Sequence, residues 1–423
     1  MGAQTGPRRH VRRASHLQGW AWKLVGGALA AAVVGGSAAT VALAADWSQR
    51  QTLTARQADG SLDFGIAVSV SGDGSTALVG APSGPIGLAY VFRRVGSTWG
   101  QPQQLSGDGA WRDEFGISVS LSNDGATALV GSSTPGTGAA YVFHRSGTTW
   151  TRQQKLTGDE SACAFGYSVA LSGDGATALV GAYQARPSGT GAAYVFHRTG
   201  TTWNQQQRLT AGDRARGDEF GFYVSLGATG NTAVIGAPGK KSTTGAAYVF
   251  RRSGTNWSQQ QKLIAGDGRV GDQFGASASL SGDGTTVLIG AAGKNSLAGA
   301  AYVFNRNGVT WSQKQELTAS KGADYDGFGS SISVNWDGST ALVGALGENS
   351  ASGAVYVFSR SRTGWSQGQK LTARKGAPSA YFGLSVAVSS DGFTALIGVP
   401  GSKSGTGEAD VFVCEARDQR VTG

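Results

Sequence analysis

The sequence has few of the residues on which disulfide scaffolds, metal centres and nucleophilic enzymes depend. Its 423 residues include only two cysteines, four histidines and one methionine. Two cysteines cannot supply a disulfide framework. No zinc-type histidine cluster, Gly-x-Ser-x-Gly elbow, phosphate-binding Gly-Lys-Ser/Thr loop or Cys–His pair occurs. We therefore expect no catalytic residue, no metal site and no cofactor, and we interpret the chain as a protein other than an enzyme.

Charged residues are also scarce, at 15% of the chain, and neither sign dominates. Of the 36 basic residues, five precede residue 45, where no acidic residue occurs: Arg8, Arg9, Arg12, Arg13 and Lys23. The remainder holds 31 basic and 27 acidic residues, an ordinary balance. Because a surface that binds nucleic acid is rich in Lys and Arg, we expect no nucleic-acid partner. We also expect a monomer.

The first 44 residues resemble a targeting segment. The basic residues precede an apolar, alanine-rich run from Leu24 to Ala44 that ends in Ala42-Leu43-Ala44, a small-x-small pattern that signal peptidases accept. We predict a signal peptide over residues 1–44, cleaved after Ala44. The run of 21 residues could also span a bilayer, so an uncleaved anchor is the alternative, and only that would give the chain a membrane partner. Both interpretations place residues 45–423 outside the cytoplasm.

Glycine, in contrast, is abundant, with 68 residues, and it recurs in a regular pattern. The pair Phe-Gly occurs seven times at intervals of 50 to 55 residues, beginning at Phe64, Phe115, Phe165, Phe220, Phe274, Phe328 and Phe382. Each pair is followed by an alternating apolar segment, in most copies an Asp-Gly turn, and a second segment of the type Thr-Ala-Leu-Val-Gly-Ala. This pattern predicts a β-hairpin, because glycine accepts the positive φ that a tight turn requires.

Two further strands complete each copy. A glycine-rich loop leads to a Tyr-Val-Phe strand, which reads Asp410-Val411-Phe412 in the last copy, and a turn then leads to Trp-x-Gln-x-Gln-x-Leu. The tryptophans of this fourth strand are Trp47, Trp99, Trp150, Trp203, Trp257, Trp311 and Trp365. The two-residue period of a strand places Trp, both Gln and Leu on one side. We therefore expect the tryptophans to serve packing and not to bind sugars.

Four strands in a repeat of 54 residues match the size of a propeller blade. The first fourth-strand segment, Trp47 to Leu53, precedes every Phe-Gly pair, and the last copy has no such segment after Phe412. Seven complete blades form only if the N-terminal strand completes the C-terminal blade, which also leaves no open edge. The sequence therefore predicts an all-β, seven-bladed β-propeller over residues 45–423. In such a ring Cys163 and Cys414 are far apart, so we expect two free thiols.

The order Phe-Gly, Gly-Ala-Pro (as at Gly80-Ala81-Pro82) and Tyr-Val-Phe resembles the FG-GAP repeat of integrin α-subunit N-terminal propellers, over about residues 46–414. The resemblance implies an upper, ligand-binding face formed by the loops between strands 2 and 3 and between strand 4 and the next strand 1. Several integrin blades bind Ca²⁺ through carboxylates between strands 1 and 2. Here these loops keep at most the Asp before the turn glycine, such as Asp124, so we predict a turn residue and no Ca²⁺.

Aromatic and basic residues in the upper loops are the candidate ligand contacts: Trp111, Tyr325, Tyr183, Arg214, Arg216, Lys240 and Lys241. Arg216-Gly217-Asp218 spells the tripeptide that integrins recognise. However, Asp218 occupies a repeat position that is also Asp in three other copies, so we interpret it as a structural loop residue. The loops between strands 2 and 3 differ in sequence, as in Ser83-Gly84-Pro85 and Glu348-Asn349-Ser350, which counts against a repeated sugar site.

These observations favour a secreted or cell-surface binding module, adhesive in role, that engages an extracellular protein or a glycan through its upper loops. Two alternatives stay open. A polysaccharide-active enzyme, lyase-like or glycosidase-like, would need carboxylates clustered on one face of the propeller. A lectin would need the same polar and aromatic residues to recur in several upper loops.

Overall fold

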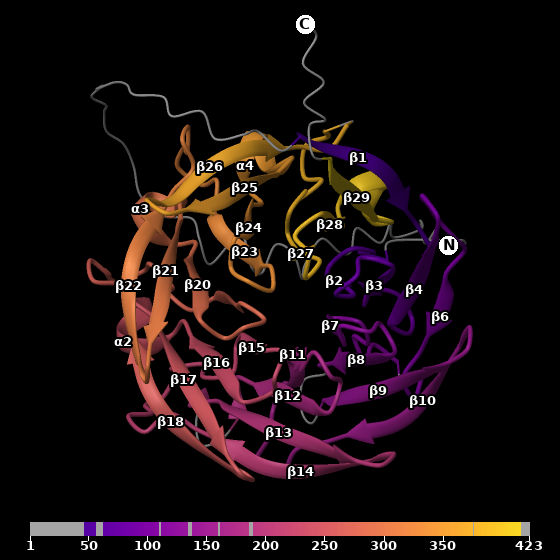
Figure 1. The fold of residues 1–423 in the computed structure, drawn as a ribbon, viewed down its shortest axis with the longest axis horizontal. Helices are drawn as coiled ribbons and strands as arrows, with labels where there is room; N and C mark the ends of the chain where they lie inside the picture. Colours follow the sequence, from indigo (N-terminus) through magenta and orange to yellow (C-terminus); the bar gives the residue numbers. More distant parts are fainter. Residues whose placement is uncertain are drawn as a thin grey trace, which may run out of the picture. The chain divides into compact units, whose positions relative to one another are not determined.

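Each copy of the repeat forms one blade of a ring in the computed structural model, which describes residues 46–55, 62–109, 111–133, 138–159, 161–185, 189–374 and 376–415. The predicted signal peptide, residues 1–44, lies outside these ranges. Seven antiparallel sheets surround a central axis (Figure 1), and the innermost strand of each follows a Phe-Gly pair or begins within it. The all-β, seven-bladed propeller predicted from the sequence is confirmed.

Within blades 1 to 6 the strands follow sequence order from the axis to the rim. Blades 1 and 2 comprise β2 (Val68–Val70), β3 (Thr76–Ala81), β4 (Leu88–Val95) and a split outer strand, β5 (Thr98–Trp99) with β6 (Gln103–Leu105); then β7 (Ser118–Leu121), β8 (Thr127–Ser132), β9 (Ala139–Ser146) and β10 (Thr149–Leu156). Blades 3 and 4 comprise β11 (Phe165–Leu171), β12 (Thr177–Ala182), β13 (Ala192–Thr199) and β14 (Thr202–Leu209); then β15 (Val224–Leu226), β16 (Thr232–Ala237), β17 (Ala246–Ser253) and β18 (Asn256–Leu263). Blades 5 and 6 comprise β19 (Ser277–Leu280), β20 (Thr286–Ala291), β21 (Ala300–Asn307) and β22 (Thr310–Leu317); then β23 (Phe328–Val334), β24 (Thr340–Ala345), β25 (Ala354–Ser361) and β26 (Gly364–Leu371).

Blade 7 is built from both ends of the described chain. Its inner strands are β27 (Val386–Val388), β28 (Thr394–Val399) and β29 (Glu408–Glu415), and its outer strand is β1 (Asp46–Leu53). Strand β1 pairs antiparallel with β29, so that Trp47 lies opposite Cys414 and Leu53 opposite Ala409. Figure 1 shows the indigo β1 beside the yellow β29. The predicted closure of the ring is confirmed, and both cysteines are free thiols, as expected.

A glutamine side chain joins the outer strands of every pair of neighbouring blades. Gln103 of blade 1 accepts a hydrogen bond from the backbone N–H of Trp150 in blade 2 at 2.9 Å and donates one to its carbonyl oxygen at 2.8 Å. The same two bonds form in six other pairs: Gln51–Trp99, Gln154–Trp203, Gln207–Trp257, Gln261–Trp311, Gln315–Trp365 and Gln369–Trp47. This Gln–Trp clasp explains why the second glutamine of the pattern is present in all seven copies.

A second circle of hydrogen bonds joins the turns between strands 1 and 2, at the lower end of the inner strands. The N–H of Gly72 donates to the carbonyl of Asn123, and the N–H of Ser390 donates to the carbonyl of Gly72. The bonds between them run from Asn123 to Gly173, Gly173 to Ala228, Ala228 to Gly282, Asp283 to Trp336 and Trp336 to Ser390. Each blade is therefore tied to both neighbours at its rim and at its inner turn.

The prediction that Trp, both Gln and Leu share one side of the outer strand is wrong. A β-bulge shifts the register in the middle of this strand, between Arg152 and Gln154 in β10, and one extra residue reverses the side that later residues face. Trp150 therefore packs in the cluster shared with blade 1, whereas Leu156 packs in the cluster shared with blade 3. One strand thus contributes to the cores on both faces of its blade.

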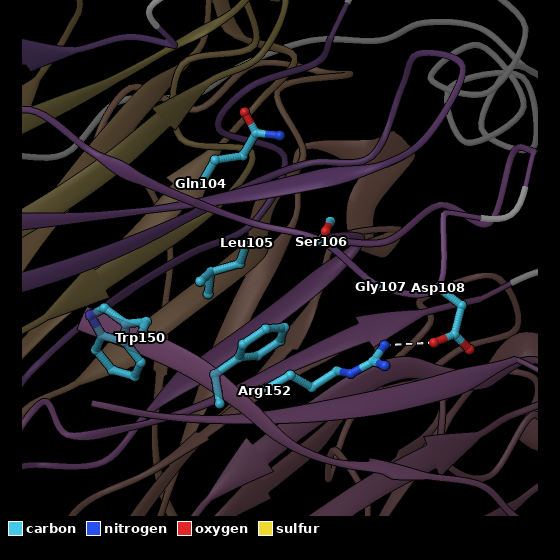
Figure 2. Close-up of a pocket in the computed structure, with 8 residues that line it drawn as sticks. Gln104, Leu105, Ser106, Gly107, Asp108, Trp150 and Arg152 are labelled. Carbon is cyan, nitrogen blue, oxygen red and sulfur yellow. Dashed lines mark hydrogen bonds and ion pairs between the residues drawn. The ribbon is translucent and has the colours of Figure 1, made fainter. Parts of the chain in front are cut away.

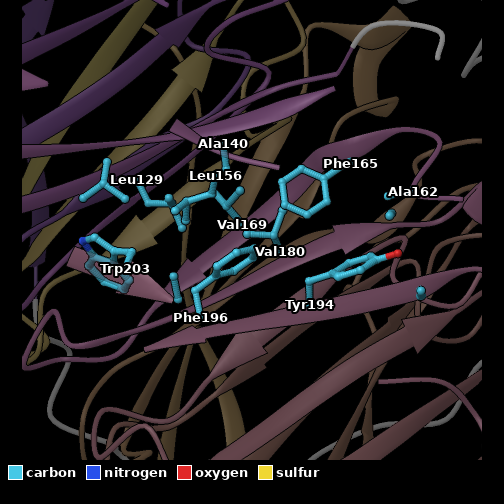
Figure 3. Packing of buried hydrophobic residues seen from close by; sticks show 14 of the residues in the cluster. Leu129, Ala140, Leu156, Ala162, Phe165, Val169, Val180, Tyr194, Phe196 and Trp203 are labelled. Atoms are coloured by element: carbon cyan, nitrogen blue, oxygen red, sulfur yellow. The ribbon is translucent and has the colours of Figure 1, made fainter. Parts of the chain in front are cut away.

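The hydrophobic cores lie between blades. Figure 3 shows the cluster in which Leu156 of blade 2 meets Phe165, Phe196 and Trp203 of blade 3. All seven outer-strand tryptophans are at most 7% exposed. Their predicted role in packing is confirmed, and their rings offer no open face for a sugar.

The glycines of Phe-Gly and Val-Gly-Ala lie where neighbouring blades touch backbone to backbone. A Cβ atom on Gly236 would lie 1.9 Å from the carbonyl oxygen of Gly275, the glycine of the next Phe-Gly pair. The same close approach occurs between Gly80 and Gly116, also at 1.9 Å. Both glycines of each repeat are thus required because neighbouring blades approach too closely there for a Cβ atom.

Replacing Gly236 by alanine should destabilise the protein by about 2–3 kcal/mol, because the added methyl group meets backbone that cannot move aside. The matched control is Gly368→Ala in β26, where the nearest atom lies 3.6 Å from the added Cβ. Urea unfolding of the two variants measures the difference. Equal midpoints for both variants would contradict the close approach.

Candidate functional site

The upper face of the propeller carries the loops between strands 2 and 3 and the loops that lead into each Phe-Gly pair. In blades 4 to 7 the first kind of loop contains one short turn: α2 (Lys240–Thr243), α3 (Lys294–Leu297), α4 (Glu348–Ala351) and α5 (Ser402–Gly405). Lys241 and Ser242 have φ values of 49° and 54°, and Asn295 and Ser296 have the same values. These loops therefore share one backbone conformation in blades 4 to 7, although their sequences differ.

Each left-handed turn supports the loop that enters the next blade. Gln273 and Phe274 donate backbone hydrogen bonds to the carbonyls of Thr243 and Thr244. The first residue of the turn is buried in α2, where Lys240 is 6% exposed and its Nζ donates to the Asp218 carboxylate at 2.7 Å. Lys240 thus contributes to the fold and, contrary to the expectation for a ligand contact, is not exposed. The buried Asp218 also confirms the structural interpretation of Arg216-Gly217-Asp218.

Charged groups gather around the same turn. Asp213 lies 3.6 Å from the Lys240 ammonium and 2.7 Å from that of Lys262. Burial opposes ionisation of Asp213, but hydrogen bonds from Lys262 and Tyr248, together with the charge of Lys240, lower its pKa to about 2. Asp213 is therefore a carboxylate at all physiological pH values. It holds the loop between blades 3 and 4 against both lysines.

Arg112 and Tyr325 hold an unfavourable backbone conformation in the loops that enter blades 2 and 6. Three residues before the phenylalanine, φ is 60° for Arg112 and 71° for Tyr325. The equivalent residues Gly217, Gly271 and Ser379 also have positive φ. This conformation costs a residue with a Cβ about 1–2 kcal/mol, and glycine avoids that cost. Two blades therefore relieve the strain with glycine, whereas blades 2 and 6 keep large side chains.

Two aromatic side chains of these loops are open to solvent. Trp111 is 69% exposed and Tyr325 is 46% exposed. The Arg112 guanidinium lies 5.4 Å from the centre of the Trp111 ring, within cation–π distance. The structure thus places two of the three predicted aromatic contacts, Trp111 and Tyr325, on the surface of the upper loops.

Tyr183 belongs to an aromatic cluster that we did not predict. Its ring centre lies 4.6 Å from that of Tyr167 and 5.3 Å from that of Phe222, and the latter two are also 5.3 Å apart. Tyr167 and Phe222 directly follow Phe-Gly in blades 3 and 4, where the other blades have Ile66, Ile117, Ala276, Ser330 and Leu384. The sequence signal for this cluster is that only two adjacent blades, 3 and 4, have an aromatic residue at this position.

Two glutamates accompany the aromatic cluster. Burial raises the pKa of Tyr167 well above its ordinary value, and the charges of Glu219 and Glu114 raise it further. Both glutamates directly precede Phe-Gly and have positive φ, 49° for Glu114 and 59° for Glu219. The aromatic cluster of blades 3 and 4 therefore lies within the electrostatic influence of glutamates from the loops that enter blades 2 and 4.

The predicted contacts fall into two groups. Trp111, Tyr183, Arg214, Arg216 and Lys241 belong to the loops of blades 2 to 4, where the three basic residues are exposed. Tyr325 lies in the loop that enters blade 6 and is separated from that group along the ring. The predicted contacts are therefore spread along the upper face.

The aspartates between strands 1 and 2 serve their turns, as predicted. Asp124 accepts hydrogen bonds from the Ser122 hydroxyl at 2.5 Å and from the Ala126 N–H at 2.9 Å. Across the described ranges, no three His, Cys, Asp or Glu residues are grouped so that they could hold a metal ion. Within the same ranges, no helix has the length and apolar character needed to cross a membrane.

Fold and surface together define a seven-bladed β-propeller with loops on its upper face, an architecture consistent with a binding module. The chain belongs to the FG-GAP repeat family, whose model matches residues 47–92, 99–143, 150–196, 203–250, 257–304, 311–358 and 365–412. Each matched unit joins the outer strand of one blade to the three inner strands of the next. FG-GAP repeats are typical of extracellular proteins, and in integrins this propeller is a non-catalytic binding fold. No curated protein matches the sequence.

Solved structures of similar fold include Kuenenia stuttgartiensis hydrazine synthase, with a TM-score of 0.58 and 13% identity over 86% of this chain and 99% of that chain. The β-propeller domain of Cps50 (Swd1) from Myceliophteria thermophila has a TM-score of 0.58 and 11% identity over 86% of this chain and 100% of that chain. At these identities the likeness shows the fold alone.

Proposed function

We propose that this chain is a secreted or cell-surface adhesion module that binds an extracellular protein through its upper face. The observation that carries the proposal is the backbone strain at Tyr325 and Arg112. Gly217 and Gly271 show that the fold accepts glycine at this position. A large, exposed side chain on a strained backbone is best explained by a contact with a binding partner, because it does not serve the fold.

The spread of the contacts favours a protein partner over a small molecule. Trp111 and Tyr325 belong to loops that enter blades 2 and 6, with blades 7 and 1 between them, so only a broad partner surface reaches both. Tryptophan, tyrosine and arginine are enriched among the residues that dominate protein interfaces. The mixture of Arg214, Arg216 and Lys241 with nearby acidic residues suits a partner of complementary charge.

Tyr325→Gly tests the proposal because it separates stability from adhesion. The variant should be as stable as the natural chain or more stable, by up to about 1 kcal/mol, because it removes backbone strain. Beads coated with it should adhere to the producing cells and their extracellular matrix about tenfold more weakly than beads coated with the natural chain.

Ser379→Gly is the matched control for this experiment. It relieves the same conformation, with φ of 59°, in the loop that enters blade 7, and adhesion should not change. Full adhesion of Tyr325→Gly would rule out this contact, and equal losses in both variants would point to loop flexibility in place of a lost side chain.

A polysaccharide-active enzyme is the second candidate, and Glu114 and Glu219 beside Tyr167 favour it. Glycoside hydrolysis commonly uses two carboxylates, one on each side of the bond that breaks. Polysaccharide turnover that disappears in both Glu114→Gln and Glu219→Gln would support the enzyme. Adhesion without turnover would support the binding module.

A further inference from the structure

The rim between blades 1 and 2 differs from the next two rims at Pro102, a bulge position whose residue type varies around the ring. Gln153 and Gln206 occupy the equivalent bulge position in blades 2 and 3, where each accepts a hydrogen bond from the indole Nε1 of the next blade's tryptophan, at 3.0 and 2.9 Å. Proline offers no such acceptor and has no backbone N–H. The outer strand of blade 1 is consequently split into β5 and β6. The buried Nε1 of Trp150 has no hydrogen-bond partner among the described residues.

The second departure is Arg152, two residues after Trp150. Blades 4, 5 and 6 have Gln259, Gln313 and Gln367 here, and each accepts a hydrogen bond from a backbone N–H after the preceding outer strand, at 2.9–3.0 Å. These glutamines draw neighbouring outer strands together. Arg152 reaches the same segment through the Asp108 carboxylate at 2.6 Å, and both side chains are exposed. At this rim a solvent-exposed ion pair between two side chains thus replaces the hydrogen bond from a backbone N–H to a glutamine.

An open surface depression of about 420 Å³ lies at this altered rim. Figure 2 shows Leu105 between Trp150 at one end and the Asp108–Arg152 pair at the other. Gln104 and Ser106 also line it. The volume falls within the range of roughly 300–1,000 Å³ that is usual for small-ligand sites. We call this depression the rim groove.

We propose that the rim groove binds one or two neutral sugar residues of a glycan. Sugar hydroxyls both donate and accept hydrogen bonds, and the groove supplies both partners, because the Arg152 guanidinium donates, the Asp108 carboxylate accepts and the Gln104 amide does both. Leu105 and Trp150, 3% and 5% exposed, form the buried floor beneath these polar groups. The site is separate from the upper-face contacts of the proposed adhesion function and does not depend on them.

Two other ligand classes fit the rim groove less well. A phosphate group needs cations without a competing anion, whereas Asp108 already pairs with Arg152 at 2.6 Å and with Lys155 at 2.7 Å. The hydrogen bond from Lys155 lowers the pKa of Asp108, which stays a carboxylate. An added peptide strand needs backbone donors along the edge, and Pro102 lacks one.

The variant that gives this rim glutamines found at the same positions in other blades, Pro102→Gln with Arg152→Gln, should close the rim groove without harming the fold. The first introduced amide can accept the Trp150 Nε1–H, and the second can accept a backbone N–H as its counterparts in blades 4 to 6 do, so the thermal midpoint should stay equal or rise. The probes are glucose, galactose, mannose and N-acetylglucosamine, each at about millimolar concentration, measured on the full chain by saturation-transfer NMR. At least one should bind the natural chain, and binding should fall at least about tenfold in the closed variant.

Two further variants keep the test decisive. Asp108→Asn should lower the affinity for the same sugar about tenfold even if the closed variant does not fold. Gln259→Arg makes the reverse exchange at the rim between blades 3 and 4 and should leave sugar binding unchanged. The proposal is overturned if none of the four sugars binds, if binding survives in the closed variant, or if inorganic phosphate competes the sugar away.

Discussion

A chain that lacks residues 46–53 should fail to form a stable propeller, and a peptide of residues 46–53 should restore it. Strand β1 is the outer strand of blade 7, and its removal exposes the edge of β29. It also removes the Gln369–Trp47 clasp, worth about 1 kcal/mol for each of its two hydrogen bonds, and the burial of Trp47 and Leu53, worth about 2–3 kcal/mol each. With the lost strand pairing, this is most of a typical stability of 5–15 kcal/mol.

Urea unfolding, followed by tryptophan fluorescence, measures the effect of the deletion. The natural chain should unfold in one cooperative transition, and the shortened chain should lose that transition until the peptide is added. A peptide with Trp47→Ala and Leu53→Ala keeps the backbone donors but loses the packing, so it should not restore the transition. A shortened chain that unfolds at the natural midpoint would show that the ring does not depend on β1.

The number of blades and the role of the closing strand could be predicted because both follow from counting repeated motifs. Such a count does not depend on any local backbone conformation. Only one closed arrangement uses all seven Phe-Gly pairs, all seven outer-strand tryptophans and the outer strand that precedes the first Phe-Gly pair. The faces of the outer strand could not be predicted in the same way. The bulge residue is Arg50 in β1, Pro102 in blade 1 and Gln153 in blade 2, and no residue type marks it. A two-residue period carried through an unseen bulge assigns the wrong face to Leu156.

The upper face was only partly predictable for a similar reason. Exposed Trp111 and Tyr325 could be found because they fall outside the tryptophan series. The burial of Lys240 could not be predicted, because it depends on Asp218, which comes from the preceding loop. The shared left-handed turns had a weak signal in the pairs Lys241-Ser242, Asn295-Ser296, Asn349-Ser350 and Lys403-Ser404. The conformation of these turns depends on hydrogen bonds to the next blade. Such contacts cannot be predicted from the sequence of a single loop.

Asp410 gives blade 7 a feature that the other blades lack. It stands where they have the tyrosine of Tyr-Val-Phe, is 1% exposed, and accepts a hydrogen bond from the Thr52 hydroxyl of β1 at 2.6 Å. Burial raises its pKa from 3.8 to about 6, and the charge of Glu408 raises it further, against the hydrogen bonds from Thr52 and Gln49 and the charge of Lys403. A carboxylate thus lies buried in the pairing that closes the ring.

Asp410→Asn should stabilise the protein at pH 7.5 by about 3 kcal/mol and have little effect at pH 4. The pKa is higher in the folded state than in the unfolded state, so the folded state binds the proton more tightly. The contribution of Asp410 to stability is therefore full below pH 3.8 and is lost as pH rises to about 6. A shift of about 2 units corresponds to about 3 kcal/mol. Asparagine, which never ionises, avoids this loss.

The measurement is the difference in unfolding free energy between Asp410→Asn and the natural chain, from pH 4 to pH 8, so that other titrating groups cancel. The difference should grow between pH 4 and pH 6 and then level off. Asp213→Asn is the control of opposite sign: the pKa of Asp213 is lowered to about 2, so its ionised form stabilises the fold and the variant should be less stable at neutral pH. A difference for Asp410→Asn that does not change with pH would mean that the carboxylate in the β1–β29 pairing does not hold its proton up to pH 6, and that closure of the ring is independent of acidity.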